Sequence, residues 1–231
     1  MTRPLPEAER TAASLVRRGH SALIAPMLLI NAVDADLDPA RYHGVIMTSG
    51  NAARALSAHR NRDALLALPV FAVGRQTARA AQDAGFASVR SADGDAGDLV
   101  RLVNSQDLSG PLLYLAGSDR ARDLPGELAA GGIEADPVVI YRAEAAEGLP
   151  EPARDALKEG RIGAVLHFSR RTAATFLDCA ETAGLICAAG RVAHYCLSPR
   201  VAEPLLAAGI KAVQIAPRPD EDALLNLLPS I

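Results

Sequence analysis

Residues 45–56 read VIMTSGNAARAL, and residues 165–176 repeat the same pattern as VLHFSRRTAATF. Each stretch joins a short apolar run, typical of a buried strand, to a polar turn with a serine and then to a segment of helical period. A repeated strand–turn–helix unit indicates a repeated architecture. The sequence therefore predicts two similar halves.

The rest of the chain alternates in the same way between short runs rich in Val, Ile and Leu and longer helical segments, which is typical of an α/β fold with parallel sheets. Several helical segments close on a glycine that suits a helix end, at Gly19, Gly85, Gly131, Gly160, Gly184 and Gly209. We expect nine strands, near residues 21–30, 44–48, 70–73, 87–90, 112–115, 134–141, 163–168, 192–197 and 212–215.

The order of the repeats predicts two parallel-sheet domains of flavodoxin- or Rossmann-like type, one inserted in the other. Residues 1–31 and 143–231 are expected to form a discontinuous α/β domain, and residues 36–138 the inserted α/β domain. Residues 32–35 and 139–142 would cross between them as a two-stranded linker. Two domains that hinge in this way commonly hold a ligand in the cleft between them.

Composition excludes several classes of protein. The 231 residues are 49% hydrophobic and 22% charged with a net charge of −3, which is too apolar for a disordered chain and too weakly charged for general nucleic-acid binding. The longest uncharged apolar run, residues 21–33, contains Pro26 and is shorter than the ~20 residues of a membrane span. No secretory leader is apparent, so we expect a cytoplasmic protein without a membrane or nucleic-acid partner, and a monomer.

Cysteine and histidine patterns indicate no metal site and no disulfide. Cys179, Cys187 and Cys196 are an odd number without a paired spacing, so we expect reduced thiols in the core. The five histidines lack metal-type spacing, and His167 and His194 are expected to be buried strand residues. No phosphate loop, dinucleotide fingerprint or serine-nucleophile elbow occurs, so no cofactor is expected.

The turns that follow the predicted strands combine hydroxyls, glycines or amides with arginines. They are residues 2–4, 48–51, 74–77, 117–120, 169–172 and 198–200. In a parallel sheet these turns share the edge where ligands bind. Each turn alone is more simply explained as a helix cap. Together, their free N–H groups, helix dipoles and arginines favour a ligand with many carboxylates. The acidic runs 93–98 and 220–222 begin helices and are expected to be structural.

The chain resembles the uroporphyrinogen-III synthase family over nearly its whole length. The resemblance rests on MTRP at 1–4, TSGNAA at 48–53, AVGRQTA at 72–78, YLAGSDRA at 114–121, VIYRAE at 139–144, HFSRRTA at 167–173 and CLSPRVA at 196–202. It implies a cofactor-free lyase of porphyrin and heme biosynthesis. Such an enzyme closes the linear tetrapyrrole hydroxymethylbilane to uroporphyrinogen III, with inversion of ring D and loss of water. That polycarboxylate substrate suits the turns described above.

By position, the resemblance makes Tyr141 the catalytic candidate, with interdomain packing as its alternative role. The substrate-binding candidates are Arg3, Thr48, Ser49, Arg75, Thr77, Gly117, Ser118, Ser169, Arg170 and Ser198, with Arg120 as a further carboxylate clamp. Helix capping and solvent exposure are the alternatives for these. The residues alone also allow a non-catalytic sensor or carrier of polycarboxylates, or a structural dimer.

Two departures from the family pattern stand out. Val201 replaces a threonine that the family usually has in its second-copy turn, so a hydroxyl contact is expected to be lost there. The family also places a hydrophobic strand immediately before its Thr-Arg-Pro motif. We therefore expect either a shortened first strand here or residues ahead of Met1.

Overall fold

The structure is a computed structural model that describes residues 1–119 and 122–229. It confirms the α/β class, with one six-stranded and one three-stranded sheet that are mainly parallel. None of the helices in these residues is long and apolar enough to cross a membrane.

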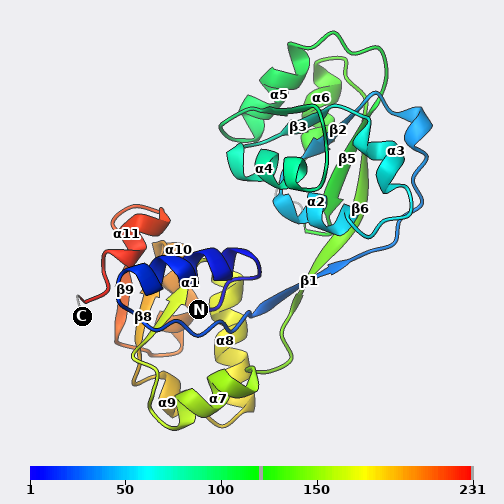
Figure 1. Cartoon of the computed structure of the whole chain (residues 1–231). Coiled ribbons are helices and arrows are strands. Elements are labelled where there is room, and N and C mark those ends of the chain that lie inside the picture. The colour runs from blue at the N-terminus through cyan, green and yellow to red at the C-terminus, as the bar shows by residue number, and fades with distance from the viewer. Residues whose placement is uncertain (120–121, 230–231) are drawn as a thin grey trace. The chain divides into compact units, whose positions relative to one another are not determined.

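The chain divides into two compact units (Figure 1). Unit 1 comprises Met1–Leu29 and Glu144–Ile231, and unit 2 comprises Ile30–Ala143. Two strands run from one unit into the other, β1 (Leu28–Ala32) and β6 (Ala135–Ala145). The two strands are neighbours in the six-stranded sheet.

Unit 2 is built on the strand order β1-β6-β5-β2-β3-β4. Its other strands are β2 (Gly44–Met47), β3 (Val70–Ala72), β4 (Val89–Ser91) and β5 (Leu112–Gly117). All pairs from β6 to β4 are parallel. The chain passes from β2 outward to β3 and β4 and then returns to β5 on the other side of β2. The strand order therefore reverses between β2 and β5, which is where open α/β sheets bind ligands.

Helices cover both faces of this sheet, because successive strand side chains point to opposite faces. The helices are η1 (Pro39–Arg41), α2 (Gly50–Leu56), α3 (Arg62–Leu66), α4 (Arg75–Asp83), α5 (Ala96–Asn104) and α6 (Leu124–Ala130). Met47 packs in one buried cluster with Leu56 of α2, whereas Ile46 packs in another with Leu99 of α5. The alternation along β2 thus gives unit 2 a core on each side of its sheet.

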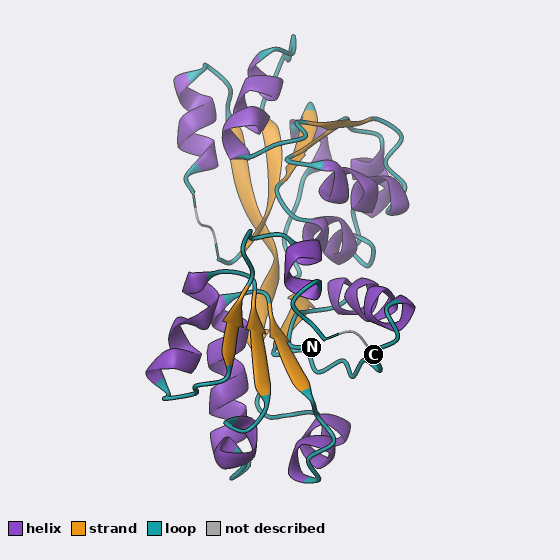
Figure 2. Cartoon of the chain, turned by 90° about the vertical axis from the view of Figure 1, so that its left-hand side faces the viewer, coloured by secondary structure: helices purple, strands orange, loops and turns teal. Residues whose placement is uncertain are grey.

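Unit 1 has the same layered plan around the parallel strands β7 (Ala164–His167), β8 (Ala193–Cys196) and β9 (Val213–Ile215), in that order. Its helices are α1 (Glu7–Arg17), α7 (Glu151–Lys158), α8 (Arg170–Thr182), α9 (Ile186–Ala189), α10 (Pro199–Ala207) and α11 (Glu221–Leu225). They lie on both sides of the three strands (Figure 2). Val165 packs with Phe176 of α8 on one face, and Leu166 with Leu15 of α1 on the other.

Two sequence-based expectations need correction. The strand expected over 21–30 begins only at Leu28, because residues 23–27 instead bond to Met1 and Thr2. Helix α6 closes on Gly131 as expected, and the glycine with a left-handed backbone follows it at Gly132. Cys187 is exposed on the short helix α9, whereas Cys179 and Cys196 are buried as expected.

The buried histidines are confirmed. His167 of β7 and His194 of β8 are both fully buried, and their side chains form a chain of hydrogen bonds. His194 Nε2 contacts the Ala189 carbonyl oxygen at 2.9 Å, and His167 Nε2 contacts His194 Nδ1 at 3.0 Å. Thr2 Oγ1 lies 3.3 Å from His167 Nδ1. The Ala189 carbonyl can only accept, so His194 Nε2 carries a proton, and in its neutral form His194 accepts at Nδ1 from His167 Nε2. The Thr2 hydroxyl donates to the Leu166 carbonyl oxygen at 2.9 Å.

Candidate functional site

The candidate site of unit 2 lies at the carboxyl ends of β2, β5 and β6. The turn after β2 carries Thr48 and Ser49, and the turn after β5 carries Ser118. A register irregularity between Ala116 and Gly117 brings Gly117 opposite Tyr141 of β6. The Ser118 N–H donates to the Tyr141 carbonyl oxygen at 3.0 Å. The sheet therefore places these predicted residues together where its strand order reverses.

Gly117 is required by the position of the Tyr141 ring. A Cβ atom at residue 117 would lie 2.6 Å from Cζ of Tyr141 and 2.8 Å from its hydroxyl oxygen. Carbon atoms attract each other at about 3.5–4.0 Å, so any side chain there would displace the phenol. Gly117 thus acts through Tyr141, by leaving space for it.

The Tyr141 side chain is partly buried, and its hydroxyl lies among polar groups. Burial raises the pKa of the Tyr141 phenol, against smaller lowering effects of a hydrogen bond with Ser49 and of the Arg54 charge. Ser49 Oγ accepts from the Asn51 N–H at 3.2 Å as the N-cap of α2, so its own O–H is free to donate to the phenol oxygen. Tyr141 therefore keeps its proton at neutral pH and can donate it.

Two residues near Tyr141 were not identified from the sequence. Tyr114 of β5 is buried, and its hydroxyl lies 3.0 Å from Thr48 Oγ1. Arg54 of α2 acts electrostatically on Tyr141. One signal was available for Tyr114: it interrupts the aliphatic run LLYLAG in a chain with only 3% aromatic residues. The sequence offered no such signal for Arg54, because in the helical pattern residue 54 looks like an ordinary surface position.

The next strand in the sheet, β3, leads to Arg75 and Thr77 at the start of α4. Thr77 is buried, and the exposed Arg75 donates to Asp93 Oδ2 at 2.9 Å. Gly74 at the N-cap provides no side-chain hydrogen bond, so the first N–H groups of α4 have no side-chain cap. Arg120 lies outside the described residues.

In unit 1 the predicted turn residues lie after β7 and β8. Ser169 caps α8, with Oγ accepting from the Thr172 N–H at 3.1 Å. Arg170 donates to Glu203 Oε2 at 3.0 Å. Ser198 is the N-cap of α10 but makes no capping hydrogen bond with its side chain. Val201, one turn into α10, is buried in the apolar core of the unit.

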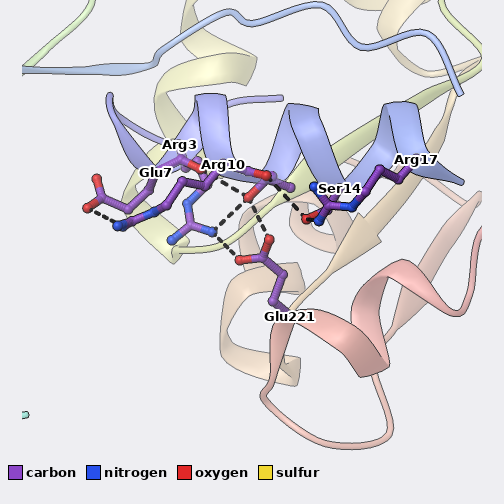
Figure 3. A network of polar contacts seen from close by, with 7 residues as sticks. Arg3, Glu7, Arg10, Ser14, Arg17 and Glu221 are labelled. Atoms are coloured by element: carbon purple, nitrogen blue, oxygen red, sulfur yellow. Dashed lines mark hydrogen bonds and ion pairs between the residues drawn. The ribbon is translucent and has the colours of Figure 1, made fainter. Parts of the chain in front are cut away.

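Arg3 is held by a network that joins α1 to α11 (Figure 3). Its guanidinium donates to Glu221 Oε2 at 2.7 Å and to Thr11 Oγ1 at 3.1 Å. It also lies 4.2 Å from the ring centroid of Phe168. The Thr11 hydroxyl donates to Glu221 Oε1 at 2.8 Å. Arg3 thus has a structural role that the sequence did not predict. Glu221 was expected to be structural as part of an acidic helix start, but not as the partner of Arg3.

No group of three or more His, Cys, Asp or Glu side chains suited to a metal ion occurs in the described part of the chain. The acidic residues at helix starts have structural roles there. Asp95 and Asp98 form a capping box on α5, and Asp220 caps α11. The candidate site therefore consists of hydroxyls, phenols, arginines and backbone N–H groups.

Comparisons with known proteins identify the family. Residues 9–226 match the family model for uroporphyrinogen-III synthase HemD. A crystal structure of uroporphyrinogen-III synthetase from Helicobacter pylori is 24% identical with a TM-score of 0.64, covering 90% of this chain and 94% of that chain.

Two uroporphyrinogen III synthase structures from the extremely thermophilic bacterium Thermus thermophilus also match. The wild type is 21% identical with a TM-score of 0.40, covering 98% of this chain and 96% of that chain. A mutant of the same enzyme, crystallised as its selenomethionine derivative, is 20% identical with a TM-score of 0.47, covering 94% of each chain. A search of curated proteins gives no match. Since the family model spans most of the sequence, the chain belongs to the uroporphyrinogen-III synthase family, whose enzymes are hydro-lyases.

Proposed function

We propose that Tyr141 is the acid that helps the hydroxyl group of hydroxymethylbilane to leave in this member of the family. The observation that supports this is the partly buried phenol of Tyr141, which is held beside Gly117 and shares a hydrogen bond with Ser49. Since burial keeps the phenol protonated, it can deliver a proton to an oxygen placed against it.

The lone pair of the pyrrole nitrogen expels the hydroxymethyl oxygen, the C–O bond breaks, and the departing oxygen takes the phenolic proton and leaves as water. The carbon left behind is electrophilic and is attacked by a carbon of ring D. The attacking carbon is the α-carbon of ring D that already carries the bridge to ring C, so a spiro intermediate forms and that bridge bond then breaks. The freed bridge carbon is electrophilic in turn and is attacked by the other α-carbon of ring D, which loses its proton and so restores the phenol. The protein's main contribution is to hold the chain in the shape that closes with ring D inverted.

Substrate carboxylates would bind at the turns that carry free N–H groups and arginines. The start of α4 lacks a side-chain cap, so its first N–H groups and the positive end of its dipole are available to anions. The start of α10 also lacks such a cap, but it begins with Pro199 and its Val201 N–H donates to the Ser198 carbonyl oxygen, so it offers the Arg200 N–H and the helix dipole. Arg75 and Arg170 each pair with one exposed carboxylate of the protein. Exposed pairs contribute only about 0–1 kcal/mol, so a substrate carboxylate can replace Asp93 or Glu203 at little cost.

The remaining predicted contacts are Thr48, Ser49, Thr77, Gly117, Ser118, Ser169, Ser198 and Arg3. We assign Arg3 the weakest role in binding, because it is already engaged by Glu221, Thr11 and Phe168. We further infer that each unit is a flavodoxin- or Rossmann-like domain, with unit 2 inserted in unit 1 through β1 and β6. The protein would act as a monomer in the cytoplasm without a cofactor.

The test is a coupled assay. Hydroxymethylbilane synthase supplies the substrate, and chromatography of the oxidised products separates isomer III from isomer I, which forms spontaneously. We expect isomer III from the unchanged protein, and a severalfold or larger loss of its rate for Tyr141→Phe. Formation of isomer I alone by the unchanged protein would favour the alternative function, a polycarboxylate sensor or carrier.

A matched control is Tyr42→Phe. Tyr42 lies just before the start of β2, whereas the candidate site lies after the end of that strand. Tyr42 is buried, and its hydroxyl donates to Asp136 Oδ2 at 3.1 Å. This variant also loses one buried phenolic hydroxyl in unit 2, but outside the candidate site. Its rate of isomer III formation should match that of the unchanged protein. If Tyr141→Phe behaves like Tyr42→Phe, Tyr141 has no part in the chemistry.

A further inference from the structure

Arg54 of α2 is partly buried, and its charged end lies over the first residues of its own helix. Side chains of a helix lean toward its amino end, so a residue four positions along covers the first turn. A Cβ atom at Gly50 would lie 3.2 Å from Arg54 Nη1 and 3.8 Å from its Cζ, which places the guanidinium against the Gly50 backbone. Arg54 Nη2 also donates to the side-chain oxygen of Asn51. These two neighbours fix the position of the guanidinium.

The same turn contains the residue that contacts the Tyr141 phenol. Ser49 is the N-cap of α2, directly before Gly50, and it shares a hydrogen bond with the Tyr141 hydroxyl. Because Gly50 has no side chain, the Arg54 guanidinium occupies the space beside that hydrogen-bonding residue. The positive charge of α2 is therefore directed toward the candidate site.

The groups around Tyr141 act on its phenol in opposite directions. Burial has the largest effect and raises the pKa of the phenol. Tyr114 on β5 and Asp119 in the turn after β5 also raise this pKa electrostatically, whereas the positive charge of Arg54 lowers it. Among the described groups that act on this phenol, Arg54 is the cation. An opposite charge favours the ionised form of an acid, so Arg54 favours the phenolate over the phenol.

A phenolate forms at Tyr141 when this residue gives up its proton. The negative charge then appears in a partly buried position, where an uncompensated charge is costly and a nearby cation acts more strongly than in water. Before that step the phenol is neutral and gains little from a cation. A group that interacts with a charge only as it develops lowers the barrier rather than the energy of the bound substrate.

We propose that Arg54 is a positioning residue for the acid Tyr141. Its guanidinium, which lies on Gly50 and binds Asn51, stabilises the phenolate that forms when the departing hydroxyl takes the phenolic proton. This inference rests on the proposed function of Tyr141. The proton that ring D later loses returns to the phenolate, which restores the neutral phenol and ends the interaction. Arg54 itself neither gains nor loses a proton, because a guanidinium stays charged.

The first experiment titrates the phenol without substrate. The chain has four tyrosines, so replacing them with fluorotyrosine, whose phenol is more acidic, gives four ¹⁹F NMR signals that can be followed in the folded protein. Single replacements of tyrosine by phenylalanine assign the signals. Arg54→Gln should raise the pKa at residue 141 by about half a pH unit or more, and Arg54→Lys, which keeps the charge, should raise it less.

Arg41→Gln is the matched control. Arg41 Cζ lies 5.5 Å from the ring centroid of Tyr42, before the start of β2. Burial and Asp136 raise the pKa of the Tyr42 phenol, and the Arg41 charge lowers it. Arg41→Gln should therefore raise the pKa of Tyr42 and leave that of Tyr141 unchanged, and Arg54→Gln should do the reverse. Equal pKa changes of both phenols in Arg54→Gln would show only an effect of net charge and would overturn the proposal.

The second experiment measures isomer III formation. Arg54→Gln should lower kcat by about threefold, the factor that corresponds to half a pH unit, and should leave the KM for hydroxymethylbilane nearly unchanged. Arg54→Lys should recover most of the rate. In a Tyr141→Phe background, Arg54→Gln should cause no further loss, since no phenolate forms there.

Three results would refute a role of Arg54 through the phenol: an unchanged pKa at Tyr141, a rise in the KM alone, or an equal loss of kcat with and without the Tyr141 hydroxyl. The proposed function fails by a different result, an unchanged rate in Tyr141→Phe, and the role of Arg54 then fails with it. A loss of rate in Tyr141→Phe beside an unaffected Arg54→Gln refutes the role of Arg54 alone.

Discussion

At the scale of single residues, the buried histidine chain predicts a loss of stability in acid. Burial lowers the pKa of His194, and burial with the neighbouring His194 charge lowers that of His167 well below its usual value. Below about pH 6.5 the unfolded chain binds protons at these residues and the folded chain does not. The free energy of unfolding should fall there by up to about 1.4 kcal/mol per pH unit for each histidine.

The buried Met1 amine adds to this effect in a higher window. Its pKa falls from 8.0 to about 6, so stability is also lost as the pH decreases from 8 to 6. Denaturant unfolding at pH 8, 6.5 and 5 measures both steps. His194→Gln should flatten the dependence below pH 6.5, whereas His43→Gln, at an exposed residue, should not. A dependence that stays steep in His194→Gln would contradict the assignment to the buried chain.

For single residues, the sequence predicted where a side chain lies in the fold better than it predicted which other side chain it contacts. Ser49, Ser118 and Ser169 follow strands, and the end of a parallel strand is recognisable from its apolar run. The Glu221 side chain that holds Arg3 is 218 residues away in sequence, and no local pattern predicts such a pair. The exposure of Cys187 was missed for a related reason, since the burial of a thiol depends on packing around it.

At the scale of elements, the register of β5 against β6 decides where Tyr141 lies. Gly117→Ala would place a methyl carbon 2.6 Å from Cζ of Tyr141, so the ring must move. We expect a severalfold or larger fall in kcat for isomer III formation. The Tm should change little, because the phenol shifts where β5 ends. Gly148→Ala is the control, since a Cβ atom there meets nothing within 4 Å. Equal kcat values for the two variants would remove Gly117 from its positioning role.

The strands and helices also differ in how well a sequence pattern predicts them. Apolar runs and helix ends predicted the strands of both sheets, because parallel strands buried on two faces are nearly continuous in hydrophobicity. Residues 21–27 were wrongly predicted as part of a strand. Their apolar run is real, but the neighbour they bond to is the two-residue stretch Met1–Thr2, which is too short to form a regular strand pair. A single sequence shows the pattern of one strand and not the length of its partner.

At the scale of the whole molecule, the proposal requires one substrate to use turns of both units. Arg75 belongs to unit 2 and Arg170 to unit 1, and each is exposed in a weak ion pair. Arg75→Ala and Arg170→Ala should each raise the KM for hydroxymethylbilane, by about tenfold if a charge-assisted contact of about 1.5 kcal/mol is lost. The double variant should combine the two effects, with isomer III still the product.

The matched controls remove other exposed arginines that pair with carboxylates away from the turns. Arg60→Ala breaks a pair with Asp36 in unit 2, and Arg161→Ala breaks a pair with Glu159 in unit 1. Both variants change the net charge as the test variants do, so any general electrostatic attraction of the substrate falls equally in all four. If the KM rises by the same factor in all four, the substrate senses only net charge. If only Arg75→Ala raises it, binding is confined to unit 2 and the shared use of both units is wrong.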